Sequence, residues 1–172
     1  MSRASSILHV CEHGQPIELT FQEILNYHGH SAPAGVAHGF KVMELAFALF
    51  DPHAPVERRE IEVTTAFAGP GARDAFEAVT RAVTDGRYTV DSALEEPDRG
   101  LTMANFVFWL SYRGRDVRLR LRPGHVSEEF IELARKPDLS DVEDKRLRWL
   151  KLEMAERLMG QDANEIYEQV RA

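Results

Sequence analysis

The sequence predicts an α+β fold in which a small, mainly antiparallel sheet is covered by helices and a helical extension ends the chain. Residues 59–67 alternate apolar and polar side chains, the pattern of a strand with one buried face. Residues 33–50 instead repeat apolar side chains at helical spacing. Two capping boxes, which begin at Thr20 and Ser140, mark the starts of helices. Strands and helices therefore occupy separate stretches of the chain, as in α+β proteins.

We expect residues 1–172 to form a single domain, long enough to bury a substantial core. Within it, residues 1–17 are an N-terminal segment, residues 18–124 the α+β core and residues 125–172 a helical C-terminal extension. A hydrophobic content of 44% with 28% charged residues is typical of a soluble globular protein.

Charge and cysteine usage restrict the function and the location. A formal net charge of −7 argues against nucleic-acid binding. No run approaches the roughly 20 apolar residues that a membrane span needs. The single cysteine, Cys11, excludes an internal disulfide framework and suits a reducing compartment, and residues 1–6 do not resemble a signal peptide. We therefore expect a cytoplasmic protein that binds neither nucleic acid nor membrane.

Residues 5–13 are expected to form a short strand before a turn at residues 14–16. Because side chains alternate along a strand, His9, Cys11 and His13 would lie on one face. Such a row could hold zinc or copper, or it is an edge segment near the terminus with solvated histidines. Both interpretations stay open, and nothing in the sequence establishes that Cys11 reaches the histidines further along the chain.

Two helices, over residues 18–29 and 33–50, are expected to enclose a short histidine-bearing loop. Gly29 suits the left-handed end of the first helix, and the proline four residues later suits the first position of the second. His28 and His30 would point roughly 200° apart on a regular helix, whereas a bent loop lets them converge. The pattern predicts two imidazoles on a tight turn, beside a helix N-terminus that favours anions.

The strand at residues 59–67 is followed by a glycine-rich turn at 69–71 and by a helix at 71–84. This strand–turn–helix arrangement is a recurrent place for an anion or an active site. Asp74 is expected in the first turn of the helix. It either interacts with the helix dipole alone, or it serves as a metal ligand, a partner of a loop histidine, or a base.

Strands are also expected at residues 88–90, 101–112 and 117–122. The second is apolar on both faces, which indicates a central strand. A turn at residues 113–115 joins it to the third, which has one apolar face and one arginine face.

The C-terminal extension is expected to be helical. Ser127 can cap a helix that ends before Pro137, and a long helix spans residues 140–160. The long helix is apolar around more than one face, so it either wraps around the domain core or packs in a dimer, and we favour a homodimer. The apolar residues are Leu147, Trp149, Leu150, Leu152, Met154, Leu158 and Met159. Residues 164–170 are expected to be a short surface element.

The loop sequence YHGHSAPAG, residues 27–35, resembles the E-subunit family of formylmethanofuran dehydrogenase, which carries His-Gly-His-x-Cys-Pro-Gly. Ala32 stands at the cysteine position of that motif and Ala34 at the following glycine position. Residues 71–76 resemble the Cys-x-x-Asp-Ala helix start of the family, with Asp74 kept and glycine in place of cysteine. Further on, residues 98–100 resemble its Asp-x-Gly segment.

The resemblance covers about residues 18–122 and implies the same mixed architecture. It also implies a metal-binding role, although the family cysteines and the C-terminal zinc ribbon of some members are missing. His28 and His30 would then be ligands of zinc or another divalent transition metal, with Cys11 as a replacement thiolate. If the site is catalytic, Asp74 or Glu44 would accept a proton from zinc-bound water and a small molecule would be the substrate.

Two alternatives compete with this hypothesis. The chain could be an accessory module of a redox enzyme that binds a haem-like, pterin or other flat cofactor. Tyr27, Phe40, Phe106 and Trp109 would then line the pocket, with Asp74 nearby and a loop histidine as axial ligand. It could also be a dimeric scaffold that has lost its metal site. A nucleophilic hydrolase is the least supported class, because Ser31 and the cysteine lack an elbow or triad context.

Overall fold

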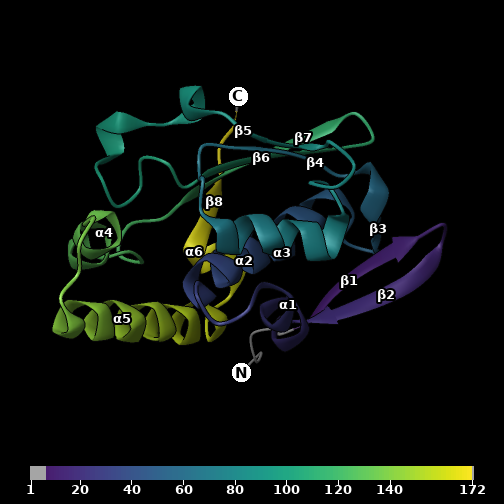
Figure 1. The fold of residues 1–172 in the computed structure, drawn as a ribbon. Coiled ribbons are helices and arrows are strands. Elements are labelled where there is room, and N and C mark those ends of the chain that lie inside the picture. The colour runs from purple at the N-terminus through teal and green to yellow at the C-terminus, as the bar shows by residue number, and fades with distance from the viewer. Residues whose placement is uncertain (1–6, 172) are drawn as a thin grey trace.

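A five-stranded sheet with helices packed beneath it forms the body of the protein in the computed structural model, which describes residues 7–171 (Figure 1). The strand order is β5-β4-β6-β7-β8, and neighbouring strands are antiparallel except for β4 and β5. These strands are β4 Glu62–Thr65, β5 Tyr88–Val90, β6 Val107–Tyr112, β7 Arg115–Leu121 and β8 Tyr167–Gln169. The predicted α+β class with a mainly antiparallel sheet is confirmed.

A second, smaller sheet has the strand order β2-β1-β3. β1 Ile7–Glu12 pairs antiparallel with β2 Gln15–Thr20 and parallel with the short β3 Val56–Glu57. The strand predicted at residues 5–13 is thus confirmed over β1, while its first two residues and the segment 1–6 lie outside the described part of the chain. The turn predicted at residues 14–16 is wrong beyond Gly14, because Gln15 and Pro16 already belong to β2. The structure accommodates this proline in an edge strand, where it is tolerated.

The first two helices have the predicted caps, but the first begins three residues after the predicted start at residue 18, because residues 18–20 belong to β2. In α1 Phe21–His28, the Thr20 side chain accepts from the Glu23 N–H and the Glu23 carboxylate accepts from the Thr20 N–H. Gly29, with φ 94°, closes α1 by donating its N–H to a carbonyl of the last turn. α2 Pro33–Phe50 then begins at its proline and ends before an Asp-Pro pair.

Helix α3 Pro70–Thr80 packs closely against the first half of α2. Small residues permit this approach: a Cβ on Gly39 would lie 2.9 Å from the Ala75 Cβ, and one on Gly71 would lie 2.6 Å from the Ala32 carbonyl oxygen. The first turns of α2 and α3 therefore lie side by side. The helix ends earlier than the predicted residue 84, because Arg81 adopts a left-handed conformation (φ 60°).

The core lies between the large sheet and these helices (Figure 1). Ile61, Val63 and Thr65 are fully buried, as predicted, but the strand covers only Glu62–Thr65 of the predicted residues 59–67. The predicted alternation is wrong at its end, because Ala66 is buried and Phe67 is half-buried. β6 is central, as predicted, but it begins only at Val107. Turns and two short 3-10 helices, Ser92–Leu94 and Pro97–Arg99, occupy the chain between β5 and β6. A third 3-10 helix, Arg58–Glu60, precedes β4.

The C-terminal region contains α4 Glu128–Arg135, α5 Asp141–Met159 and the short α6 Ala163–Ile166. The caps predicted at Ser127 and Ser140 are confirmed by their hydrogen bonds to Phe130 N–H and Glu143 N–H. The predicted surface element at residues 164–170 is wrong. It forms α6 and the edge strand β8, in which the Tyr167 side chain is completely buried. Across residues 7–171, no helix combines the length and apolarity needed to cross a bilayer.

Candidate functional site

Three side chains form a hydrogen-bonded chain where α1, the histidine loop and α3 meet. His28 Nδ1 lies 2.7 Å from Asp74 Oδ2, and His28 Nε2 lies 3.2 Å from Ser31 Oγ. A carboxylate only accepts hydrogen bonds, so Nδ1 donates to Asp74. In the neutral imidazole Nε2 is then the acceptor, and Ser31 donates its hydroxyl hydrogen to it. The order aspartate–histidine–serine is that of a nucleophile activated by an oriented base.

The base in this chain is well shielded, whereas the serine is accessible. The His28 side chain is 5% exposed, and that of Asp74 is 31% exposed. Ser31 is exposed in the loop that follows Gly29. The position of Asp74 corrects one expectation: it is the fifth residue of α3, beyond the first turn, and its carboxylate is directed to His28. Among the expected alternatives, the structure shows the contact with a loop histidine.

A cavity of about 420 Å³ opens beside Ser31. Its walls come from the first turns of α2 and α3, the start of β6, α4 and α5. Phe67 and Phe106 stack with ring centroids 4.7 Å apart and supply an apolar wall. Asn105 adds a buried Oδ1 that has no hydrogen-bond partner among the described residues. The cavity thus combines an apolar wall with polar groups, as ligand sites do.

The same cavity is electropositive at one end. The N–H groups in the first turn of a helix have no acceptor within the helix, and no side chain caps α2 or α3. The first-turn residues Ala34, Gly35 and Gly71 line the cavity. The partial positive charge of both helix N-termini favours a negatively charged or polar ligand group. Lys151 from α5 also lines the cavity, and its Nζ donates to the Ser31 carbonyl oxygen at 3.0 Å. This contact fixes the serine loop against α5.

His30 does not line the cavity beside Ser31 described above, but it lines a second cavity. This second cavity, of about 600 Å³, is shared by the loop and α5, and Ser31 and Lys151 stand between the two hollows. His30 is exposed and makes no hydrogen bond with another described residue. The structure therefore brings His28 together with Asp74 and Ser31, and not with His30 around a common point.

Cys11 belongs to another part of the molecule. Its Sγ lies 3.3 Å from Glu57 Oε2 and 3.5 Å from the Val56 carbonyl oxygen, on β3. Desolvation, reinforced by the Glu57 carboxylate, raises the pKa of the thiol, so a metal-binding thiolate is disfavoured there. Within residues 7–171, no cluster of three or more histidine, cysteine or carboxylate side chains is placed to hold a metal ion.

The aromatic residues expected around a flat cofactor are also dispersed. Tyr27 is 54% exposed, whereas Phe40 is completely buried and packs edge-on against Phe21. Trp109 lies on β6, where the Arg118 Cζ is 3.9 Å from the centroid of the tryptophan ring. Of the four aromatic residues expected at the cofactor, Phe106 alone lines the cavity beside Ser31.

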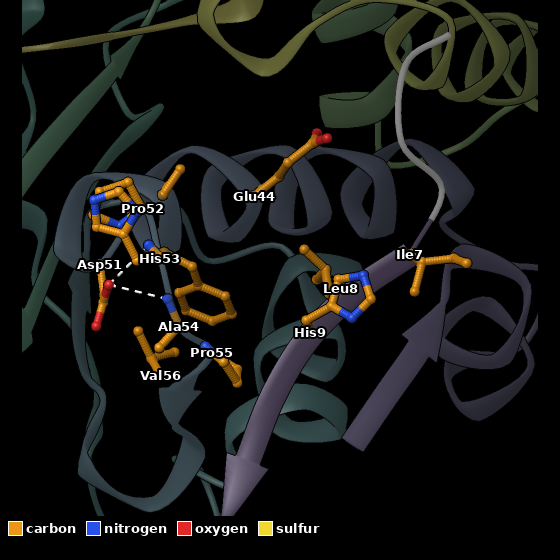
Figure 2. A pocket seen from close by; sticks show the side chains of 12 residues that line it. Ile7, Leu8, His9, Glu44, Asp51, Pro52, His53, Ala54, Pro55 and Val56 are labelled. Carbon is orange, nitrogen blue, oxygen red and sulfur yellow. Dashed lines mark hydrogen bonds between the residues drawn. The ribbon is translucent and has the colours of Figure 1, made fainter. Parts of the chain in front are cut away.

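Glu44, the alternative proton acceptor, lines a third cavity of about 450 Å³ near the end of α2 (Figure 2). It accepts a hydrogen bond from the buried Lys41 ammonium at 2.9 Å. In the same cavity, Asp51 turns back onto its own loop and accepts from the His53 and Ala54 N–H groups (Figure 2). These N–H groups lower the pKa of Asp51. The carboxylates of this cavity are thus committed to contacts within the fold.

Sequence reasoning missed the role of Ser31, because the aspartate that orients its histidine lies 46 residues beyond that histidine. It also missed Asn105 and Lys151, because no local motif marks a residue that lines a cavity from a distant element. The two helix-starting prolines, each after a turn that contains glycine or histidine, are the signal that could have indicated two helix N-termini at one site. Compared with known protein families and with curated proteins, the sequence matches none.

Proposed function

We propose that this chain is an enzyme that transfers or hydrolyses an acyl group of a small molecule bound in the cavity beside Ser31. The observation that carries the proposal is the hydrogen-bonded chain Asp74–His28–Ser31 at the edge of that cavity. A serine hydroxyl is a weak nucleophile by itself, and an adjacent oriented base is what activates it.

The mechanism follows from the roles of the three residues. Ser31 Oγ attacks the acyl carbon while His28 Nε2 takes the hydroxyl proton. Asp74 holds the imidazole through Nδ1 and stabilises the imidazolium that forms. His28 then returns the proton to the leaving group, and water or another acceptor releases the acyl group from Ser31. First-turn N–H groups of α2 border the cavity and supply donors for the developing oxyanion.

Covalent labelling tests this proposal. We expect a fluorophosphonate ester to form one adduct on the folded protein, with peptide mapping placing it on Ser31. Ser31→Ala should abolish that adduct, and Ser127→Ala, which removes a helix-capping hydroxyl, should retain it. An unlabelled wild-type protein, or an adduct that persists in Ser31→Ala, would contradict the proposal.

A second candidate is the binding of a metal ion, zinc, at the loop. The contact between His28 Nδ1 and Asp74 favours it, because metal-bound histidines commonly donate their other ring N–H to a carboxylate. The fit is incomplete: His28 and His30 are two ligands, and a catalytic zinc usually takes three from the protein. Elemental analysis of untagged protein separates this candidate from the first, since it requires near-stoichiometric metal that a His28→Ala, His30→Ala variant loses.

The resemblance to the E-subunit family of formylmethanofuran dehydrogenase stays a separate hypothesis. Its two cysteine positions correspond to Ala32 and Gly71, and a Cβ on Gly71 would lie 2.6 Å from the Ala32 carbonyl oxygen. A cysteine at position 71 would therefore require α2 and α3 to pack further apart. A role as a redox-enzyme accessory with a haem-like or pterin cofactor predicts a visible absorbance band in the purified protein, whereas a scaffold without chemistry predicts no band, no metal and no adduct.

We further propose a cytoplasmic location and a homodimer as the form in solution. Supporting the dimer, three of the large apolar side chains that the described chain leaves exposed lie on α5, namely Val142, Trp149 and Leu152.

A further inference from the structure

One face of α5 has the character of an interface, although no other helix or strand of the described chain covers its large apolar side chains. The Arg146 guanidinium, 4.9 Å from the centroid of the Trp149 ring, is one contact that this face makes within the described chain. Val142, Trp149 and Leu152 are 78%, 55% and 56% exposed. Spacings of seven and three residues place them on one side of the helix, away from the buried Leu147 and Leu150. In Figure 1, α5 lies along the lower edge of the molecule, with its other side turned to the rest of the fold.

This face continues as a heptad stripe, which we call the α5 stripe: Val142, Lys145, Trp149, Leu152, Glu156 and Met159. Met159, at its end, is partly buried against the core. The alternating steps of three and four residues are those of the a and d positions in a helix pair. Two of the six positions are charged, and they decide how a partner can lie.

Lys145 and Glu156 have no ion pair with another described residue. Their neighbours on α5 are paired within the chain: Arg146 with Glu129, Arg148 with Asp144, and Arg157 with Glu153. The stripe therefore leaves one cation and one anion available to a partner, near its two ends.

The stripe is self-complementary in one orientation. Lys145 and Glu156 are equally distant from the middle of the stripe, between Leu150 and Lys151, as are Trp149 and Leu152. A two-fold axis at this midpoint would set Lys145 against Glu156 of the partner subunit, twice. It would also set Trp149 against Leu152 of the partner subunit. A parallel pair would instead oppose like charges, Lys145 to Lys145 of the partner subunit, which is unfavourable.

We propose that a second copy of this chain docks antiparallel along the α5 stripe, through a two-fold symmetric interface. The second cavity lies along the flank of this stripe, since Arg148 and Leu152 line it together with His30 and Ser31. The partner copy would form an additional wall of that cavity. This consequence for the site rests on the proposed function, whereas the docking itself does not.

Charge reversal tests the register. We expect the full-length protein to be a dimer by light scattering, and Lys145→Glu or Glu156→Lys alone to raise the dissociation constant about tenfold or more, because each creates two like-charge contacts. The double variant Lys145→Glu, Glu156→Lys should restore the wild-type constant. An equimolar mixture of the two single variants should also restore dimers, since every contact is again between opposite charges.

A matched control is Asp98→Lys, which reverses an exposed charge in the 3-10 helix Pro97–Arg99, outside α4 and α5, and should leave the dissociation constant unchanged. A wild-type protein that is monomeric at all concentrations overturns the proposal. So does a dimer that tolerates both single reversals, or a double variant that is not restored. Serine labelling is measured separately, so failure of the interface leaves the proposed acyl-transfer reaction tested on its own.

Discussion

The buried histidine of α2 makes stability depend on pH in a way that can be calculated. His38 is 1% exposed; its Nδ1 lies 2.8 Å from the Tyr167 hydroxyl and its Nε2 lies 3.3 Å from Met154 Sδ. A thioether only accepts, so Nε2 donates to it and Nδ1 accepts from the tyrosine. Desolvation, with smaller contributions from the charges of His125 and Arg157, lowers the pKa of His38 from 6.5 to about 3.

The sign of the effect follows from this shift. The unfolded chain binds a proton at His38 below about pH 6.5, while the folded protein does not until about pH 3. Stability from the neutral imidazole is therefore complete above pH 6.5 and is lost as the pH falls towards 3. At pH 5 the loss is about 2 kcal/mol, since one pKa unit corresponds to about 1.4 kcal/mol.

Urea unfolding at pH 7.5 and pH 5 measures this contribution. A His38→Gln variant is the control, because its glutamine does not titrate and all its other titrating groups are those of the wild type. We expect the drop in free energy of unfolding between the two pH values to be about 2 kcal/mol larger in the wild type than in the variant. Equal drops in the two proteins would refute the assignment of a neutral, buried imidazole.

Two further predictions concern the packing of α2 against α3 and the hydrogen bond between His38 and Tyr167. Gly39→Ala should destabilise the protein by about 1–3 kcal/mol, because its methyl group would meet the Ala75 Cβ at 2.9 Å. Gly160→Ala is the control: its methyl group would make an ordinary contact, 3.4 Å from the nearest atom, and a similar loss there would contradict the packing argument. Tyr167→Phe should cost about 1–3 kcal/mol, because His38 Nδ1 would be left buried without a partner. Thermal unfolding checks both, and an unchanged midpoint in Tyr167→Phe would show that the hydroxyl contributes nothing.

The parts of the fold that the sequence predicts are those with local causes. The capping boxes at Thr20 and Ser140 fix helix starts within one turn of chain, and the alternation at residues 61–65 indicates which face of β4 is buried. Strand β8 could not be found in this way. The burial of Tyr167 depends on His38, 129 residues earlier, and on pairing with β7.

The candidate site divides in the same manner. His28 and Asp74 stand in local motifs that indicate possible partners, while no neighbour of Ser31 in the sequence suggests a triad. Close packing of Gly39 and Gly71 against the facing helix brings the distant elements together, and a sequence does not reveal which glycines face each other. Tyr27 and Phe40 do not converge on a cofactor as expected, because the sequence does not show how deeply each is buried. Tyr27 is exposed, whereas Phe40 belongs to the core.

The central claim is that Asp74, His28 and Ser31 act as one unit, and the rate of Ser31 labelling in Asp74→Asn tests it most directly. An asparagine keeps the size of the side chain but can donate to Nδ1, which would turn Nε2 into a donor that no longer accepts the serine proton. We expect the second-order rate of fluorophosphonate labelling to fall at least about 100-fold, with the circular dichroism spectrum unchanged. Labelling of Ser31 at the wild-type rate in this variant would show that the hydrogen-bonded chain does not activate the serine.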